Sequence, residues 1–281
     1  MMKLNSNLYG MIVPHAPTLL EDELDGKDNA VVNALRDSGK RLKEWGVEAV
    51  IAVTTHWQTG ANFALDAADA HKTVTDYYGF RSEVEYDVAG QRELANRLLA
   101  AGAKSLVFPQ NAKHGVDHAV TIPLHFMFPE RDVPVVPLSV AGSPIDAFRW
   151  GRALGGALRE WGGKTLLLVS GSLSHDLRTL MTGRSRREHG EFDRQVLDLL
   201  SSGNGMAVLE LDEKLVELAK PEGAFRDLYI LLGALGSTAK GEVKAYEAMP
   251  GVGLGVVEFD DSGYSESEEE VLKRMPRGIV H

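Results

Sequence analysis

The chain has 281 residues, of which 44% are hydrophobic and 25% are charged, enough material for one large α/β domain with a sizeable core. Forty acidic and thirty basic residues give a formal net charge of −10, which disfavours nucleic acids and anionic membranes as partners. The sequence contains no cysteine, so disulfides and thiolate metal sites are excluded and any metal must be held by nitrogen and oxygen ligands.

Further broad classes are disfavoured by the distribution of apolar and basic residues. The sequence does not open on a charged and then apolar leader, and no apolar run approaches the roughly 20 residues of a membrane span. No internal repeat and no linker is visible, so we expect a single cytoplasmic domain over residues 1–281. The one basic run, Arg184–Arg187, is interpreted as a solvated loop.

The first two predicted strands each end at a histidine. An apolar stretch stops at Pro14, because proline cannot donate to a sheet ladder, and His15 follows at once. A helix with apolar residues at helical spacing is then predicted to end at Gly46. The next strand, AVIAVTTHW (49–57), ends at His56. Open α/β sheets bind their ligands at the carboxyl ends of strands, so both histidines are candidate site residues.

Residues 58–90 have an irregular pattern that includes the aromatic segment DYYGFRSEVEYDVAG. A long loop that contains several aromatic residues favours a functional flap over disorder. We therefore interpret residues 58–90 as an active-site flap. The helix predicted from about residue 91 to 101 follows and is expected to end at Gly102.

The middle of the chain repeats the arrangement seen at His56. A loop and a short helix are predicted in residues 114–129, and a buried strand over 133–140 precedes a helix over 147–161. The stretch TLLLVSGSLSH (165–175) again consists of an apolar strand, small polar residues and a histidine. His175 is therefore expected at the same edge of the sheet as His56.

The last third of the chain is mostly helical and closes with two strands. Pro221 suits the first turn of a helix over residues 221–236, which would place the Glu222 carboxylate beside the positive end of that helix. Other helices are predicted near 192–200 and 212–218, the strands over 243–249 and 253–259, and a peripheral tail over 262–281. The whole pattern predicts an α/β domain whose central mixed, largely parallel sheet is flanked by helices on both faces.

Histidines and carboxylates are the chemistry-bearing residues of this chain. Two histidines and one carboxylate on one face of a metal, with open positions opposite, form the usual non-heme iron(II) site for oxygen chemistry. His15, His56 and Glu222 are candidates for such a set. They are far apart in sequence, so their spacing does not show that they meet, and the same ligands also suit zinc.

Six segments, in order from about His15 to Gly236, carry a family resemblance. They are VPHAP around His15, TTHW around His56, the flap DYYGFRSEVEY, VDHAVTIPL around His118, SGSLSHDL around His175 and EGAFRDLYILLGAL around Glu222. Together they resemble the class III extradiol dioxygenases, the family of the protocatechuate 4,5-dioxygenase catalytic subunit. This family also includes aminophenol and DOPA dioxygenases.

The resemblance implies a chemistry and a set of roles. His15, His56 and Glu222 would bind iron(II), and zinc or manganese is compatible with the same ligands in a purified sample. His175 would be the acid/base histidine and His118 a further active-site histidine. The substrates would be O2 and a catechol or aminophenol, cleaved beside the hydroxylated carbons to a semialdehyde-type product.

Three further residues are assigned to substrate binding, and they are His114, Arg81 and Tyr78. Arg81 stands at a flap position where proline is common in the family, and it would pair with a substrate carboxylate unless it is only a solvated flap residue. His114 either lines the pocket or stabilises its loop. The remaining histidines, His71, His125, His189 and His281, are interpreted as structural.

Alternative functions use the same residues. A serine hydrolase is disfavoured because the nucleophile elbow has glycine two residues on either side of the serine, whereas Gly171 adjoins Ser172. A zinc-dependent hydrolase with the same ligands is harder to exclude. A third alternative is a non-catalytic or redox-linked metal-binding protein similar to the Memo proteins, although the flap and the segments at His118 and His175 look more like the ring-cleaving branch. We also expect a homo-oligomer, and the sequence leaves open whether a separate small subunit is needed, as in some relatives.

Overall fold

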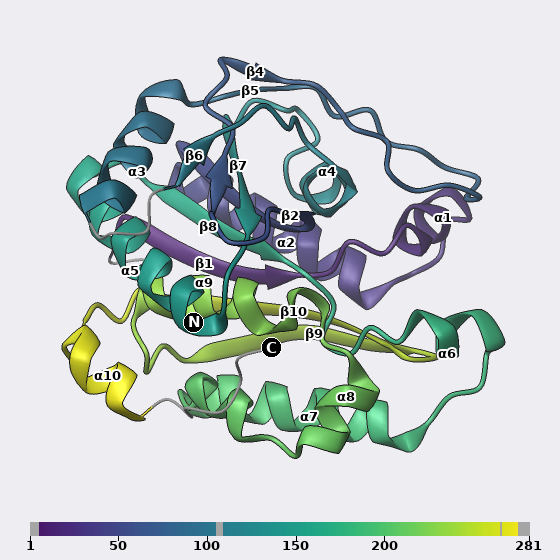
Figure 1. The fold of residues 1–281 in the computed structure, drawn as a ribbon. Coiled ribbons are helices and arrows are strands. Elements are labelled where there is room, and N and C mark those ends of the chain that lie inside the picture. The colour runs from purple at the N-terminus through teal and green to yellow at the C-terminus, as the bar shows by residue number, and fades with distance from the viewer. Residues whose placement is uncertain (1–5, 105–108, 265, 275–281) are drawn as a thin grey trace.

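The computed structural model describes residues 6–104, 109–264 and 266–274. Within them an eight-stranded sheet has the order β6-β3-β7-β2-β8-β1-β10-β9 (Figure 1). The four central strands, β7, β2, β8 and β1, are parallel to one another, and β10 and β9 extend the sheet as an antiparallel hairpin. The prediction of a mixed, largely parallel sheet is therefore confirmed. The strands are β1 (Leu8–Val13), β2 (Ala49–Gln58), β3 (Ala64–Leu65), β6 (Gln110–Asn111), β7 (Val135–Val140), β8 (Thr165–Ser170), β9 (Gly241–Met249) and β10 (Val252–Asp260).

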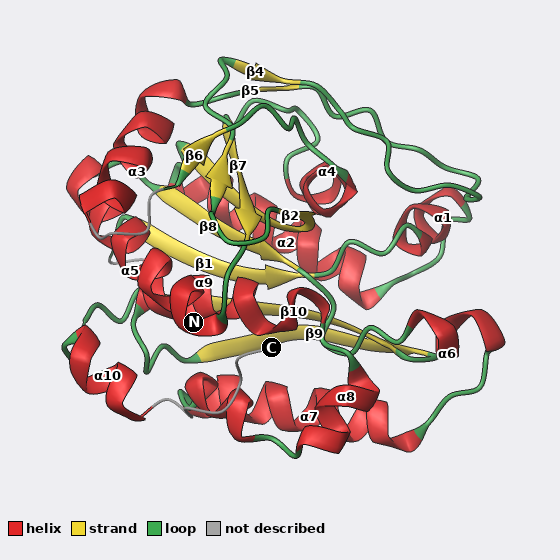
Figure 2. Ribbon diagram, in the orientation of Figure 1, coloured by secondary structure: helices red, strands yellow, loops and turns green. Residues whose placement is uncertain are grey.

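Helices cover both faces of this sheet, as Figure 2 shows. They are α1 (Thr18–Leu24), α2 (Ala30–Trp45), α3 (Arg92–Lys104), α4 (His118–Met127), α5 (Pro144–Trp161), α6 (Leu177–Thr182), α7 (Arg187–Ser202), α8 (Glu213–Ala219), α9 (Arg226–Leu235) and α10 (Glu268–Arg274). Two 3-10 turns, η1 (Gly205–Glu210) and η2 (Glu222–Phe225), precede α8 and α9. None of the described helices is long and apolar enough to cross a membrane.

Alternate residues of the central strands bury opposite faces of the sheet. In β2, Ile51 and Val53 join the core beneath α3, α5 and α9, whereas Val50 and Ala52 join the core beneath α2 and α4. Because both faces are covered, the strand sequence is continuously apolar, as is typical of parallel sheets. This two-sided burial leaves the ends of the strands as the place where polar residues gather.

Some of the glycines that were predicted to end a helix do so, and others do not. Gly46 ends α2 with a left-handed backbone (φ 84°), as predicted. Gly102 does not end α3, which continues to Lys104. A Cβ at Gly102 would lie 2.3 Å from Pro109 and 2.6 Å from the ring of Trp150. This glycine is therefore needed for close packing and not for a helix end.

The segment around Glu222 also differs from the prediction. The helix expected from Pro221 begins only at Arg226, and η2 precedes it. Gly223, Ala224 and Phe225 all have positive φ angles, of 68°, 50° and 63°. Glu222 consequently sits in a strained turn before α9 and is not at the helix N-terminus. Its charge is compensated by other groups, described below.

The predicted flap and the predicted tail are both only partly separate from the main fold. In residues 58–90, β3 joins the main sheet, and a small ribbon of β4 (Ala70–His71) and β5 (Val88–Ala89) brackets an irregular stretch over 72–87. In the tail, Val271 of α10 is buried in the core, so the described part of residues 262–281 packs onto the domain.

Candidate metal centre

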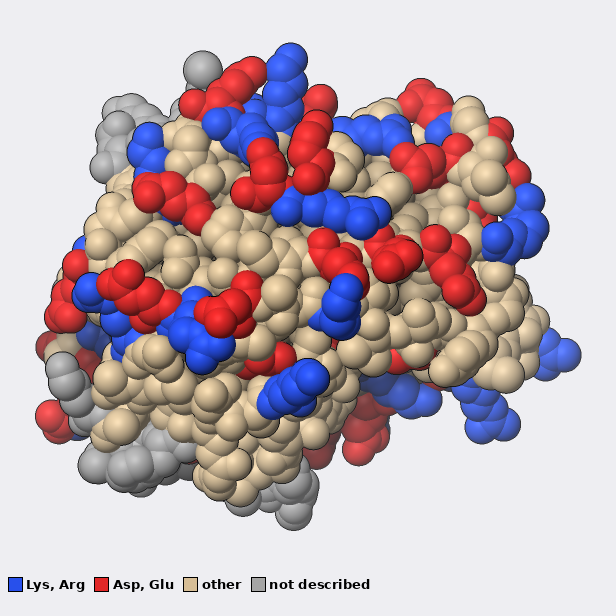
Figure 3. Space-filling view, turned by 90° about the horizontal axis from the view of Figure 1, so that it is seen from above, with Lys and Arg blue, Asp and Glu red and all other residues tan. Residues whose placement is uncertain are grey.

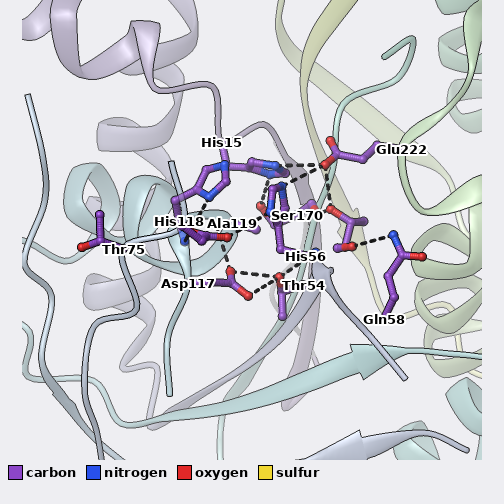
Figure 4. A network of polar contacts seen from close by, with 12 residues as sticks. His15, Thr54, His56, Gln58, Thr75, Asp117, His118, Ala119, Ser170 and Glu222 are labelled. Atoms are coloured by element: carbon purple, nitrogen blue, oxygen red, sulfur yellow. Dashed lines mark hydrogen bonds and ion pairs between the residues drawn. The ribbon is translucent and has the colours of Figure 1, made fainter. Parts of the chain in front are cut away.

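Three strands that are neighbours in the sheet end at the cluster of histidines. In the order β2-β8-β1, all parallel, the carboxyl ends of the strands lie at one edge. His15 follows β1, His56 lies near the end of β2, and the main chain after β8 contacts η2 through Glu222. Figure 4 shows these side chains pointing toward one another. The rule that α/β sheets bind ligands at strand ends predicted that these side chains would lie at one edge of the sheet, and the structure brings them together there.

An irregularity in β2 presents His56 to this edge. Pairing of β2 with β7 is regular as far as Thr54 opposite Ser139 and resumes only at Gln58 opposite Val140. Thr55, His56 and Trp57 thus bulge out of the ladder. Such bulges are common beside active sites, where they redirect side chains. The motif TTHW therefore corresponds to a local break in the strand and not to its simple end.

The closest contacts of the cluster join His15, His56 and Glu222. Oε1 of Glu222 lies 3.1 Å from Nε2 of His15 and 3.4 Å from Nε2 of His56. His118 is the fourth member, since its ring centroid is 5.1 Å from that of His15 and 4.1 Å from that of His56. His15, His56 and His118 each offer a ligand nitrogen within 4.8 Å of the others. The described residues thus contain two overlapping donor sets, which share His15 and His56.

The orientations of His15, His56 and Glu222 are each fixed by a contact with a group outside the cluster. Nδ1 of His15 lies 3.0 Å from Oγ of Ser170, and Nδ1 of His56 lies 3.0 Å from a carboxylate oxygen of Asp76. Glu222 accepts hydrogen bonds from the hydroxyl of Thr55 at 2.9 Å and from the backbone N–H of Ser172 at 2.7 Å. The Nε2 atoms of both histidines are thereby directed at the same carboxylate oxygen. Such outer contacts are the usual means of orienting metal ligands.

The protonation equilibria of the cluster also suit a cation. Burial lowers the pKa of His15, despite the Glu222 carboxylate beside it. Burial alone would raise the pKa of Glu222, but His15, His56 and, more weakly, His175 hold it well below its usual range. Although burial opposes it, hydrogen bonds to Asp76 and Glu222 raise the pKa of His56 to about 10. The anionic surroundings therefore favour a positive charge at this point, and a bound metal would take the place of that proton.

His118 lies at the N-terminus of α4 and is fixed by the 72–87 stretch. Its Nδ1 is 2.6 Å from Oδ1 of Asp76, and its backbone N–H donates to the same oxygen at 3.1 Å. The other oxygen of Asp76 contacts His56, so one carboxylate bridges two imidazoles. Burial alone would raise the pKa of Asp76, but the hydrogen bonds from His118 and His56 hold it well below its usual range. The ring of Tyr77, buried at 8% exposure, lies 5.1 Å from that of His118.

Asp117 connects the start of α4 to the end of β2. It is buried, caps α4 by accepting from the N–H of Ala119 at 3.0 Å, and accepts two contacts from the hydroxyl of Thr54 at 2.8 and 2.9 Å. The bonds fix His118 relative to His56 through their neighbours in the chain. Figure 4 shows this link below the histidine cluster.

His175 lies on the side of the cluster occupied by Glu222. Its imidazole is near enough to contribute to the lowered pKa of that carboxylate. Its backbone N–H donates to the carbonyl of Ala219 at 2.7 Å, and the residue forms an isolated antiparallel bridge with Val252. The preceding Ser174 donates to Asp193 at 2.8 Å. The histidine is therefore held by the chain before η2 and by β10.

The three residues assigned to substrate binding lie in different surroundings. His114 stacks on Trp57 with ring centroids 4.3 Å apart, and its Nε2 is 2.8 Å from Asp117. Tyr78 is 79% exposed, and its hydroxyl donates to the carbonyl of Thr75 at 3.4 Å. Arg81 forms two 3.0 Å hydrogen bonds with Asp25, beside the end of α1. The structure thus brings neither Tyr78 nor Arg81 into contact with the cluster, because their side chains leave the 72–87 stretch in other directions.

The histidines interpreted as structural lie outside the cluster. Nε2 of His71 contacts the carbonyl of Val135 at 3.0 Å, and His125 pairs with Glu23 at 2.7 Å. His189 is buried in α7, with Nε2 3.7 Å from Asp176. His281 lies outside the described residues.

Sequence reasoning did not assign roles to Asp76, Tyr77 or Thr55. All three lie in segments that had been singled out, namely the flap and the TTHW motif. A carboxylate in a flap segment is a usable signal, since an imidazole that binds a metal commonly pairs its other nitrogen with a carboxylate. Which carboxylate does so depends on the path of the loop, and no local pattern encodes that path.

Comparison with known proteins is consistent with this geometry. Residues 9–257 match the profile of a family described as the catalytic LigB subunit of aromatic ring-opening dioxygenase. A curated relative named 4,5-DOPA dioxygenase extradiol, from Beta vulgaris, is 28% identical over 78% of this chain and 87% of its own length. The beta subunit of 2-aminophenol 1,6-dioxygenase from a Pseudomonas species is 23% identical over 90% of this chain and 93% of its own.

A solved structure shares the fold. The crystal structure of an uncharacterized Escherichia coli K12 protein superposes with a TM-score of 0.71, covering 90% of this chain and 99% of that one. The two sequences are 22% identical, so this likeness concerns the fold alone.

Proposed function

This chain belongs to the LigB family of aromatic ring-opening dioxygenases, the class III extradiol enzymes, and on that premise we propose that it is an iron(II)-dependent dioxygenase of a catechol or an aminophenol. In this proposal His15, His56 and Glu222 hold the metal. His118 and His175 are the further active-site histidines. The family is metal-dependent, and the choice of iron and of these roles is our inference.

The observation that carries the proposal is the convergence of His15, His56 and Glu222. They lie just after β1, in β2 and in η2, and both imidazole Nε2 atoms lie within 3.4 Å of one Glu222 oxygen. Two imidazoles and a carboxylate are the ligand set typical of iron sites that handle oxygen. The hydrogen bonds to Ser170, Asp76 and Thr55 support it, because they leave the Nε2 atoms and one carboxylate oxygen facing the same point.

The charges of the cluster residues also suit a divalent cation. Glu222 is 7% exposed at its side chain, and a buried carboxylate is stable only with compensating positive charge or hydrogen bonds. Iron(II), when bound there, would supply electron transfer between an aromatic diol and dioxygen. Everything else in the reaction depends on groups that bind the ring, exclude water or move protons.

We assign His118 and His175 to proton handling in this reaction. His118, held through Nδ1 by Asp76, would direct its Nε2 at a substrate hydroxyl. His175, on the Glu222 side, would give the proton needed when the oxygen–oxygen bond breaks. Both atoms of O2 would enter the product, and the ring would open beside the hydroxylated carbons to a carboxylate and an aldehyde. The Tyr77 ring would exclude water from the His118 side.

The substrate class and the assembly rest on the relatives. One relative is named for DOPA and another for 2-aminophenol, which supports a catechol or an aminophenol as the ring that is opened. The second relative is named as a beta subunit, which supports a partner subunit for this chain as well. We further propose a homo-oligomeric, cytoplasmic enzyme that binds neither nucleic acid nor membrane. His114, Tyr78 and Arg81 remain proposed substrate contacts, and Tyr77 joins them on the strength of its position.

Oxygen uptake by iron-reconstituted protein is the direct test. We expect uptake with at least one of a panel of catechol, protocatechuate, gallate, DOPA and 2-aminophenol, together with a coloured ring-opened product. The protein should be reconstituted anaerobically and its iron content measured first. Full iron occupancy without oxygen uptake on the entire panel would contradict ring cleavage and favour a non-catalytic, Memo-like role. Hydrolytic activity with zinc alone would favour a hydrolase.

Variants separate metal binding from proton transfer. His15→Ala and Glu222→Gln should lose the metal, because each removes one of three ligands. His175→Phe should keep the metal and lose turnover. Glu213→Gln, on the exposed first turn of α8, removes the same charge as Glu222→Gln and serves as its control. If His175→Phe emptied the site, or if Glu222→Gln kept full occupancy, the assigned roles would be wrong.

A further inference from the structure

A hollow lined by basic side chains lies on the side of the molecule away from β4 and β5. It is formed by α6, the loop 183–186 and α8, which lie close together at the lower right of Figure 1. Its volume is about 620 Å³. Hollows of roughly 300–1,000 Å³ are typical of small-molecule sites. The hollow has the size of a ligand site, and nothing in the proposed ring-cleavage reaction uses it.

The charge of this hollow is opposite to that of the whole chain. Five cationic side chains line it against two acidic ones, Asp176 and Glu217, although the chain has a formal charge of −10. The five are Arg178, Arg184, Arg186, Lys214 and Lys220. By contrast, the face seen in Figure 3 carries acidic and basic side chains interspersed. We refer to this hollow, with its five cations, as the basic groove.

Most of these cations are free to meet a ligand. Lys220 pairs with Asp176 at 2.8 Å. Among the described residues, no carboxylate lies within ion-pair distance of the other four cations of the groove. Arg187, from the same RSRR run, instead pairs with Glu191 and is not part of the lining. The basic run is therefore divided, because Arg184 and Arg186 line the groove and Arg187 does not.

The fold explains this division. Gly183 has a left-handed backbone (φ 65°) and ends α6, and α7 begins only four residues later at Arg187. The short connection contributes Arg184 and Arg186 to the lining of the groove, to which α8 contributes Lys214. The run lies in an exposed loop, as the sequence predicted, but this loop also lines a concave surface together with residues of α6 and α8.

We propose that the basic groove binds a small polyanion, a molecule that carries two or more neighbouring phosphate or carboxylate groups. Guanidinium groups make paired hydrogen bonds with such groups, and the ammonium groups of Lys214 and Lys220 add point charges. The shape of the groove favours a small ligand over a nucleic acid. The five cations line one local concave surface of a chain with a formal charge of −10, whereas polynucleotides bind along extended positive stripes.

The test is calorimetric titration of the full-length protein with two probes in a buffer free of other polyanions. Pyrophosphate tests phosphate recognition and citrate tests carboxylate recognition. We expect saturable 1:1 binding of at least one probe. The double variant R184Q/R186Q should weaken it by at least about tenfold, because each hydrogen bond between charged groups commonly contributes that much.

Two controls make the result specific. R187Q/R194Q removes the same number of charges from exposed positions of α7 outside the groove and should change affinity less than about twofold. His15→Ala should also leave it unchanged, which separates the groove from any metal that the probes might bind at the histidine cluster. This control also makes failure here distinguishable from failure of the ring-cleavage proposal.

Three outcomes would overturn the inference. They are the absence of saturable binding of either probe by the wild type, equal losses in R184Q/R186Q and R187Q/R194Q, and a loss of binding in His15→Ala alone. The first would mean that the groove is only a solvated basic surface. The second would indicate a general effect of net charge, and the third would place the anion at the histidine cluster.

Discussion

Asp76 holds His118 in place, with Oδ1 of the carboxylate 2.6 Å from Nδ1 of the imidazole. The second oxygen of Asp76 lies 3.0 Å from Nδ1 of His56, so an irregular stretch of chain supplies one support for two members of the cluster. Nε2 of each histidine therefore stays available to contact a metal or a substrate. The order of residues 72–87 and the geometry of the cluster are coupled through this carboxylate.

Asp76→Asn tests that coupling. The amide is nearly the same size but loses the charge and one acceptor, so we expect turnover or metal affinity to fall by about 10- to 100-fold. The free energy of unfolding should change far less, because the side chain is partly exposed. Metal content and oxygen uptake are the measurements. Glu85→Gln makes the same change of charge at an exposed position of the same stretch and should behave as wild type. Equal activity of the two variants would contradict a positioning role for Asp76.

Tyr77 and Tyr78 are neighbours with opposite environments, and their variants should differ accordingly. The Tyr77 hydroxyl accepts from the N–H of Val84 at 3.1 Å, and its ring contacts that of His118. Tyr77→Ala should loosen residues 72–87 and raise their rate of limited proteolysis by about tenfold or more. Tyr78→Ala, at a highly exposed side chain, should lie within about 0.5 kcal/mol of wild type in stability. A larger increase in KM for Tyr78→Ala than for Tyr77→Ala would support the proposed substrate contact by Tyr78, and an unchanged KM would contradict it.

The turn after Glu222 stores backbone strain that a glycine would relieve. Ala224 has φ 50° and ψ 45°, a conformation that costs an L-residue about 1–2 kcal/mol. Ala224→Gly removes this cost. It also raises the conformational entropy of the unfolded chain, which favours unfolding by somewhat less than about 1 kcal/mol. We therefore expect the free energy of unfolding to increase by about 0.5 kcal/mol. Chemical denaturation measures it. Ala100→Gly, at an exposed position inside α3, is the matched control and should destabilise by about 1 kcal/mol. Similar losses in both variants would show that Ala224 is not strained.

Asp176 should make stability depend on pH in the acidic range. The Lys220 ammonium, followed by the Thr179 hydroxyl, lowers the pKa of Asp176 from 3.8 to about 2. A carboxyl group whose pKa is depressed by folding stabilises the native state above its unfolded pKa, and that stability is lost as the pH falls through the folded value. Because Lys220 is half exposed, we expect about 1–2 kcal/mol at neutral pH.

Asp176→Asn isolates this contribution. Wild type should be the more stable protein at pH 7, and the difference should shrink as the pH falls from about 4 to about 2. Denaturant titrations at several pH values measure it. A difference that stays constant across this range would mean that the Asp176–Lys220 pair does not titrate as its hydrogen bonds indicate.

Local features of the sequence determined the elements and the edge of the sheet that bears the cluster. Apolar runs that stop at Pro14 and at TTHW predicted strands with histidines at their ends, because strand burial and the missing proline donor are short-range effects. The same kind of local signal failed at Gly102, where the contact that requires glycine comes from Pro109 and Trp150.

Only the tertiary structure decided which side chains meet. Whether Glu222 reaches His15 depends on a turn with three positive φ angles and not on the helix that its sequence suggests. Whether Asp76, Tyr77, Tyr78 or Arg81 faces the cluster depends on the path of an irregular stretch with no periodicity to read. The same holds for the basic groove, since the RSRR run lines a concave surface only together with residues of α6 and α8. Backbone preferences act between neighbours, whereas these contacts join residues far apart in the chain, and so only folding brings them together.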